Sequence, residues 1–400
     1  MILLAGGDIV LPDRIMSSGS LLIDGDRIVA IDDRAAIRPA GAEVLDVAGT
    51  SIVPGFIDVH VHGVNGLDTL DGNGAVAAIA ERLPRYGVTA FCPTTVACDH
   101  RTLAAFLTEV EQCRRAPAPR AARVLPAHLE SNFINPEYRG AQPAACLRSP
   151  RAAVPADDSV FSASDILAAI AAARREVGIV TVAPELPGGI ELVRDLATAG
   201  HRVSLGHSGA DFDTAVAAIE AGARHATHLF NRMTPMTHRA PGLPGAVLSR
   251  EEVAVELICD THHVHPAMCK VALTAKGPGG VMAITDATAG AGLPVGATAR
   301  LGGRTIRVTE FAATLDDGTV AGSTLTMDRA FRNVVNTFQR SLVDAATVCS
   351  TTPARALGLD GLGAIEQGSI ADLVVVDRSF NVLHTMIGGR LAYRREADRN

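Results

Sequence analysis

The chain has 400 residues, of which 48% are hydrophobic and 20% charged, so it is long enough for one large globular domain and a smaller one. The formal net charge of −7 argues against a nucleic-acid-binding protein, which would need a basic surface. The seven cysteines form no C-x-x-C pair. No basic residues precede the short apolar run at residues 1–5, so we expect no targeting segment. No apolar run approaches the roughly eighteen residues of a membrane span. We therefore expect a cytoplasmic protein that binds neither membranes nor nucleic acids.

Both ends of the chain carry the pattern of short β-strands. Apolar segments at residues 21–23 and 28–31 flank Asp24-Gly25-Asp26, which predicts a hairpin. Near the other end, residues 371–377 (ADLVVVD) are typical of a strand, and Gly388-Gly389 marks a turn before another. Because a different pattern lies between them, we expect a small β-sandwich domain built from residues 1–53 and 356–400.

Residues 54–355 alternate short apolar runs with amphipathic stretches. One helix is expected from Ser164 to Val177 with a Ser164-Asp165 cap, and another from about Ile190 to Gly200. Strands are expected to begin near Ile57, Val88, Val124, Ile179, Val203, His225, Val253 and Val281. Eight strands alternating with helices predict an α/β fold, a (β/α)8 TIM barrel, with a doubly wound open sheet as the competing architecture.

Side chains that can bind a metal stand at the ends of several of these expected strands. His60 and His62 are two residues apart in one strand, so they point to the same face. Other expected strands end in candidate ligands at Glu130, His207, His228 and Asp286. A single histidine at a strand end is usually structural, but so many such ends at the face where barrels build active sites favour a metal centre. Imidazole and carboxylate groups suit Zn, Fe, Mn or Co.

The remaining histidines are interpreted differently. We expect His100, His201, His225 and His384 to be structural or solvated, and His262 and His265 not to take part in the chemistry.

Several segments together resemble a known family. Residues 54–63 (PGFIDVHVHG) resemble the opening signature of the amidohydrolase superfamily. Further segments resemble the N-acetylglucosamine-6-phosphate deacetylase branch of that superfamily. In chain order they are 128–130 (HLE), 205–208 (LGHS), 226–231 (ATHLFN), 239–242 (RAPG), 285–288 (TDAT) and 322–327 (GSTLTM). The resemblance covers nearly the whole chain.

This resemblance implies a metal-dependent removal of the acetyl group from N-acetylglucosamine 6-phosphate, giving glucosamine 6-phosphate and acetate. It implies one divalent metal bound by Glu130, His207 and His228. A second metal would be held by His60 and His62, with Glu130 bridging the two ions and Asp286 nearby. Asp286 would act as general acid and base, because an amine leaves poorly unless it is protonated.

The resemblance also implies how the substrate is bound. Arg239 and His263 would hold the sugar phosphate, with Asn231 against the phosphate or its bridging oxygen. It further implies a homodimer in which the loop carrying Arg239 reaches the phosphate site of the neighbouring copy.

Three places depart from the family pattern. Ser131 and Asn132 stand where the family usually has a Gly-Pro pair. Gln142 stands where the family has a histidine that helps to polarise the carbonyl group of the substrate. Arg232 replaces the small residue that usually follows the asparagine at position 231. We expect these segments to line the substrate pocket and to shift specificity, so that N-acetylglucosamine 6-phosphate is hydrolysed slowly.

Two rival functions remain open. The closer one is deacylation of another N-acyl amino-sugar phosphate or another anionic amide. The other is a barrel that binds its ligand without turning it over, which the intact metal and Asp286 set disfavours. A covalent serine or cysteine hydrolase is disfavoured because no G-x-S-x-G segment is present.

Overall fold

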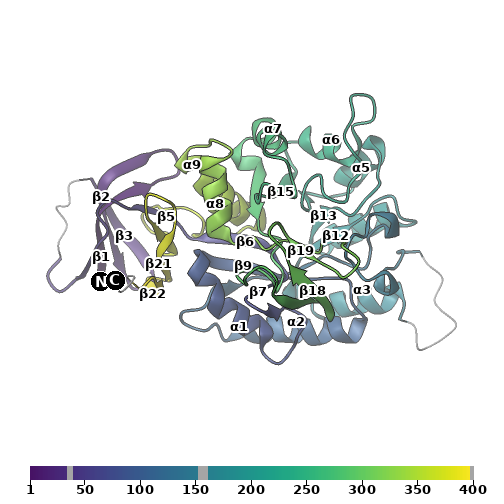
Figure 1. Cartoon of the computed structure of the whole chain (residues 1–400), viewed down its shortest axis with the longest axis horizontal. Coiled ribbons are helices and arrows are strands. Elements are labelled where there is room, and N and C mark those ends of the chain that lie inside the picture. Colours follow the sequence, from purple (N-terminus) through teal and green to yellow (C-terminus); the bar gives the residue numbers. More distant parts are fainter. Residues whose placement is uncertain (34–38, 152–160, 397–400) are drawn as a thin grey trace.

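The computed structural model describes residues 1–33, 39–151 and 161–396. A small β-domain lies beside a larger body in which helices surround a central set of strands (Figure 1). Within the described ranges, no helix is both long and apolar enough to cross a membrane.

The small domain joins the two ends of the chain in one sheet. Within the described residues this sheet has eight strands: β1 (Ile2–Val10), β2 (Ile15–Asp24), β3 (Arg27–Asp32), β4 (Glu43–Asp46), β5 (Ser51–Pro54), β20 (Leu373–Val376), β21 (Val382–Ile387) and β22 (Arg390–Arg394). β5 pairs with β1 on one side and antiparallel with β20 on the other, so it connects the N-terminal strands to the C-terminal ones. The predicted hairpin is present between β2 and β3. The sheet encloses an apolar core to which strands from both chain ends contribute.

The larger body is the predicted barrel. In the part of the chain that the structure describes, its eight strands follow one another in chain order: β6 (Phe56–Val61), β9 (Val88–Thr95), β11 (Ala127–Leu129), β12 (Val177–Val182), β13 (Arg202–Leu205), β14 (His225–Ala226), β15 (Ala254–Ile258) and β16 (Val281–Ile284). All neighbouring pairs are parallel. A parallel bridge between Val61 and Ala287 brings β16 back to β6. The short strand β10 (Arg123–Val124) pairs with β9 beside this ring.

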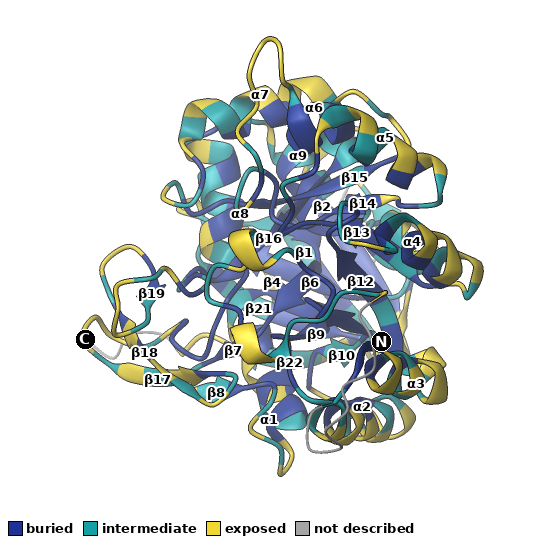
Figure 2. Cartoon of the chain, turned by 90° about the vertical axis from the view of Figure 1, so that its right-hand side faces the viewer, coloured by how far each residue is buried: buried dark blue, intermediate teal, exposed yellow. Residues whose placement is uncertain are grey.

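Each barrel strand is followed by a helix. Beyond the eight helices in this alternation, two more lead back to the small domain. The ten helices of the described chain are α1 (Ala75–Arg82), α2 (His100–Arg115), α3 (Ala163–Ala172), α4 (Gly189–Thr198), α5 (Phe212–Glu220), α6 (Gly242–Leu248), α7 (Pro266–Lys276), α8 (Met327–Asn336), α9 (Leu342–Ala346) and α10 (Thr352–Leu357). Figure 2 shows buried strands at the centre and helices around them with exposed outer faces. This alternation confirms the barrel and excludes the doubly wound sheet.

The helix boundaries correct one local prediction. The N-cap of α3 is Ser162, which forms a capping box with Asp165, so Ser164 is not the cap. α3 also ends at Ala172, before the predicted Val177. Gly200, with φ of 92°, follows the end of α4 as expected.

Insertions at the carboxyl ends of the barrel strands add to the mouth of the barrel. They are the hairpin of β7 (Gly63–Val64) and β8 (Leu67–Asp68), and a separate sheet of β17 (Thr298–Leu301), β18 (Arg304–Val308) and β19 (Ala313–Thr314). The chain passes from the small sheet to the barrel between β5 and β6. The domain boundaries at residues 53 and 355 stay a prediction.

Candidate metal centre and substrate cavity

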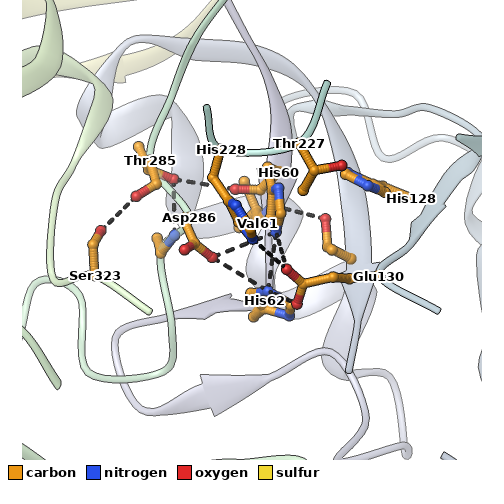
Figure 3. A network of polar contacts seen from close by, with 12 residues as sticks. His60, Val61, His62, His128, Glu130, Thr227, His228, Thr285, Asp286 and Ser323 are labelled. Atoms are coloured by element: carbon orange, nitrogen blue, oxygen red, sulfur yellow. Dashed lines mark hydrogen bonds and ion pairs between the residues drawn. The ribbon is translucent and has the colours of Figure 1, made fainter. Parts of the chain in front are cut away.

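Six buried side chains converge at the carboxyl ends of the barrel strands: His60, His62, Glu130, His207, His228 and Asp286. The structure thus brings together all of the residues that were predicted to bind metal or to act as acid and base. Five of them, all except His207, are labelled in Figure 3, where they point toward a common centre.

The first group consists of Glu130, His207 and His228. Oε1 of Glu130 lies 2.9 Å from Nε2 of His207 and 2.9 Å from Nε2 of His228. The two imidazole nitrogens are 3.0 Å apart. Two nitrogen ligands of one tetrahedral zinc ion lie roughly 3.3–3.4 Å apart, so the spacing is close to that of neighbouring ligands.

The second group consists of His60, His62 and Asp286. Nε2 of His60 is 3.1 Å from Nε2 of His62, and Oδ1 of Asp286 lies 3.4 and 3.3 Å from these two nitrogens. Glu130 lies between the groups, with Oε2 3.4 Å from Nε2 of His62. The two groups therefore share one carboxylate.

Contacts at Nδ1 of two of the imidazoles, those of His207 and His60, direct their Nε2 atoms toward the centre. Nδ1 of His207 lies 2.8 Å from the carbonyl oxygen of Tyr138, which can only accept, so Nδ1 donates its hydrogen there and Nε2 is the nitrogen that faces the centre. Burial lowers the pKa of His60 to about 4, which keeps that ring neutral. Imidazole and carboxylate groups are the ligands that a divalent transition metal prefers, and a bound ion would displace any proton from Nε2.

The local charge also fits a cation. Burial lowers the pKa of His62, but its contacts with Asp286 and Glu130 outweigh burial and raise this pKa to about 10. The two carboxylates therefore draw positive charge into the centre. Together these groups fit a divalent metal site.

Three of these residues have a strained backbone. His207, His228 and Asp286 have φ of 46°, 31° and 49°, in the left-handed region that side chains other than glycine rarely adopt. The main-chain oxygen of Asp286 accepts the N–H of Ser323 at 2.8 Å. A Cβ on the neighbouring Gly322 would lie 2.9 Å from that same oxygen, so glycine is needed there. This contact explains the Gly322-Ser323 segment that the sequence analysis singled out.

A cavity of about 580 Å³ opens above the metal-binding groups. Its wall includes four of the predicted substrate-binding residues, namely Gln142, Asn231, Arg232 and His263. The fifth, Arg239, is exposed on the loop between β14 and α6 and does not line this cavity. The predicted contact of Arg239 with substrate would be made in a second copy of the chain, and it stays a prediction.

The two ring nitrogens of His263 have different surroundings. Its Nδ1 is 2.5 Å from Oδ2 of Asp260, whereas its buried Nε2, on a ring that lines the cavity, has no hydrogen-bond partner within the described structure. Burial lowers the pKa of His263, but the hydrogen bond and charge of Asp260 outweigh it and raise the pKa above its usual value. When the ring is protonated, its Nε2 can donate a hydrogen bond to a group in the cavity.

Known proteins resemble this chain over its whole length. The model of the amidohydrolase family matches residues 51–392. The chain belongs to the amidohydrolase family.

An N-acetylglucosamine-6-phosphate deacetylase of Bacillus subtilis (strain 168) is 34% identical to this amidohydrolase, with 98% of this chain and 97% of the relative covered. An N-acetylgalactosamine-6-phosphate deacetylase of Escherichia coli O157:H7 is also 34% identical, with 95% and 97% covered. The crystal structure of N-acetylglucosamine-6-phosphate deacetylase from Pasteurella multocida superposes with a TM-score of 0.89 at 27% identity, covering 98% of this chain and 99% of that one. The protein is therefore a hydrolase of this deacetylase branch.

The departures from the family pattern have different structural roles in this amidohydrolase. Gln142 lines the cavity, but its amide group donates to the Glu130 carboxylate and its Oε1 accepts the N–H of Ala97 at 2.7 Å. Its side chain therefore contacts a candidate metal ligand. The expectation that Ser131 and Asn132 line the pocket is wrong: both are buried and donate to main-chain carbonyl groups, because the loop after β11 turns them inward.

The structure also adds residues that sequence reasoning missed. His262, which was expected to take no part, lines the cavity, whereas His265 accepts the N–H of Ala267 as the N-cap of α7. Glu256 in β15 lies 2.9 Å from Nδ1 of His60. A lone glutamate inside an apolar strand was the available signal for it.

Proposed function

We propose that this amidohydrolase removes the acetyl group of N-acetylglucosamine 6-phosphate, releasing acetate and glucosamine 6-phosphate. The observation that carries the proposal is that the metal-binding groups and the unpartnered Nε2 of His263 share one cavity. A substrate with an amide at one end and an anion at the other fits such a cavity. The names of the deacetylase relatives support the same reaction.

We assign the metal ligands as the sequence predicted. Glu130, His207 and His228 would hold one ion of Zn, Fe, Mn or Co, and His60 and His62 a second. A divalent ion bound there would supply a nucleophilic water at neutral pH and positive charge opposite the developing oxyanion. Glu130, which contacts both groups, would orient the ligands of each.

Asp286 would move the proton. It is buried at the floor of the cavity, and burial raises its pKa while the neighbouring His60 and His62 outweigh this and lower it. An ionised Asp286 can take a proton from the attacking water and give it to the leaving amine. This transfer is needed because an amine anion is a poor leaving group.

Three further residues of the cavity wall would bind the phosphate. They are His263, Asn231 and Arg232, and a cationic imidazole and a guanidinium both form charge-assisted hydrogen bonds to phosphate. We propose that Arg239 of a second copy completes this site in a homodimer. The support is its exposed position outside the cavity of its own chain.

A second candidate is a related substrate, either another N-acyl amino-sugar phosphate or another anionic amide. Arg232 also borders a second chamber of about 510 Å³ together with Arg139, so two cationic side chains line that chamber. A relative that is named for N-acetylgalactosamine 6-phosphate is as similar as one named for the glucosamine compound.

The test is acetate release from a panel of N-acyl amino sugars by protein that is supplied with divalent metal. We expect acetate from N-acetylglucosamine 6-phosphate at a higher kcat/KM than from the unphosphorylated sugar. Faster turnover of N-acetylgalactosamine 6-phosphate would favour the second candidate. Release of no acetate from any member would overturn the proposal.

A further inference from the structure

Glu256 occupies an unusual place in the barrel. It lies in the middle of β15 with Val255 and Leu257 on either side, and its side chain is 0% exposed. A carboxylate buried among apolar groups is strongly destabilising unless it is partnered. Its contacts therefore indicate what it does.

The Glu256 carboxylate contacts one residue from each of the two metal-binding groups. Oε2 lies 2.9 Å from Nδ1 of His60 and accepts the main-chain N–H of His228 at 3.3 Å. The main-chain oxygen of Glu256 accepts the N–H of Leu229 at 2.8 Å. One residue thus holds the ring of His60 and the strained turn at His228, whose φ is 31°.

These contacts decide which nitrogen of His60 faces the centre. Because Nδ1 is bound to the carboxylate, Nε2 is directed at His62 and Asp286, at 3.1 and 3.4 Å. A hydrogen bond from the remote ring nitrogen to a carboxylate orients a ligating histidine and strengthens its binding of a metal. In Figure 3 the His60 ring stands at the middle of the network, between His62, Glu130 and His228.

We infer that Glu256 is a positioning residue that orients His60 and His228 for metal binding. This inference rests on the proposed metal centre. Glu256, His60 and His128 also lie close enough together to form a metal site of their own. However, Nδ1 of His128 is 3.0 Å from the carbonyl of Val59 and its Nε2 is 2.9 Å from Oγ1 of Thr181, so both ring nitrogens are already engaged. The group therefore supports the centre above it.

The experiment compares Glu256→Leu and Glu256→Gln with the wild type by Zn²⁺ titration and metal analysis. We expect Glu256→Leu to bind Zn²⁺ about 10- to 100-fold more weakly. Glu256→Gln keeps the volume and one oxygen acceptor for His60, so its affinity should fall between the other two. Glu109→Leu is the matched control: Glu109 accepts the N–H of Val76 on the outer helices, and the change should leave Zn²⁺ affinity unaltered.

Unfolding of the metal-free proteins separates positioning from a general loss of structure. We expect the metal-free Glu256→Gln protein to melt within a few degrees of the wild type while its Zn²⁺ affinity is reduced. Wild-type Zn²⁺ affinity in Glu256→Leu, or in Glu256→Gln if the leucine variant does not fold, would overturn the inference. Failure of the wild type itself to bind Zn²⁺ or a related divalent ion would instead overturn the proposed metal centre.

Discussion

Oδ2 of Asp260 lies 2.5 Å from Nδ1 of His263, so a buried carboxylate supports a ring that lines the cavity. The same carboxylate accepts the main-chain N–H groups of His262 and His263, both at 2.9 Å. Asp260 therefore holds the loop after β15 and also raises the pKa of the His263 ring.

This pair predicts a pH dependence of substrate affinity. The pKa of His263 is raised in the folded protein, so the cationic ring that we propose as a phosphate ligand is present below that pKa and is lost as the pH rises through it. Replacing Asp260 by Asn removes the group that raises the pKa. We expect KM for N-acetylglucosamine 6-phosphate to increase at a lower pH in Asp260→Asn than in the wild type. Coincident KM–pH profiles of the two proteins would show that His263 does not bind the phosphate as a cation.

The second prediction concerns proton transfer by Asp286. Asp286→Asn keeps the shape of the side chain but cannot take up a proton, so kcat should fall by at least about a hundredfold while KM changes little. Metal content is measured in parallel, because Asp286 lies near the metal-binding groups. Asp316→Asn, a change on an exposed loop, serves as the control and should have the wild-type rate. A near-normal kcat in Asp286→Asn would exclude the acid–base role.

The third prediction concerns Arg232, which departs from the family pattern and lines the cavity. Arg232→Ala should raise KM for the 6-phosphate substrate on the order of tenfold, which is the effect of losing one charge-assisted hydrogen bond. The same change should leave KM for the unphosphorylated sugar unaltered. Arg194→Ala on the outer face of α4 is the matched control. If the wild type reaches about 10⁵ M⁻¹s⁻¹ on N-acetylglucosamine 6-phosphate and Arg232→Ala changes nothing, the predicted shift in specificity is wrong.

The fourth prediction tests whether Arg239 acts across a dimer. Arg239→Ala and Asp286→Asn should each be poorly active alone. In a mixed dimer, one of the two sites would combine an intact Asp286 with Arg239 from the other copy. Random exchange makes about half of the dimers mixed, so mixing the two variants should restore activity toward about a quarter of the wild-type value. Light scattering gives the oligomeric state. No gain on mixing, or full activity in a monomer, would refute the shared site.

Much of the fold could be predicted because the physical signals are local. Strands such as β6 and β9 are apolar runs that begin close to a glycine, Gly55 or Gly87, and helices such as α4 end just before one, Gly200. In a parallel barrel all carboxyl strand ends meet on one face. Knowing that His207 and Asp286 follow strands was therefore enough to predict that they line the same cavity.

The remainder depends on contacts that chain order does not encode. The contact between Glu256 and His60 crosses the barrel interior, and only the register of the barrel strands brings the two side chains together. The inward turn of Ser131 and Asn132 is set by the carbonyl groups of Thr181 and Cys98, which lie far away in sequence. Gln142 was predicted to act on substrate, and its hydrogen bond to Glu130 appears only in the folded chain.

Metal analysis combined with acetate release tests the central claim most directly, using the wild type, His228→Ala, His207→Ala and His60→Ala. We predict one or two divalent ions per chain in the wild type. His228→Ala and His207→Ala should lose tight metal binding and activity. If the wild type holds two ions, His60→Ala should hold one. His384→Ala in the small domain should match the wild type in both measurements. Full metal occupancy together with the full rate of acetate release in His228→Ala and His207→Ala would contradict the account.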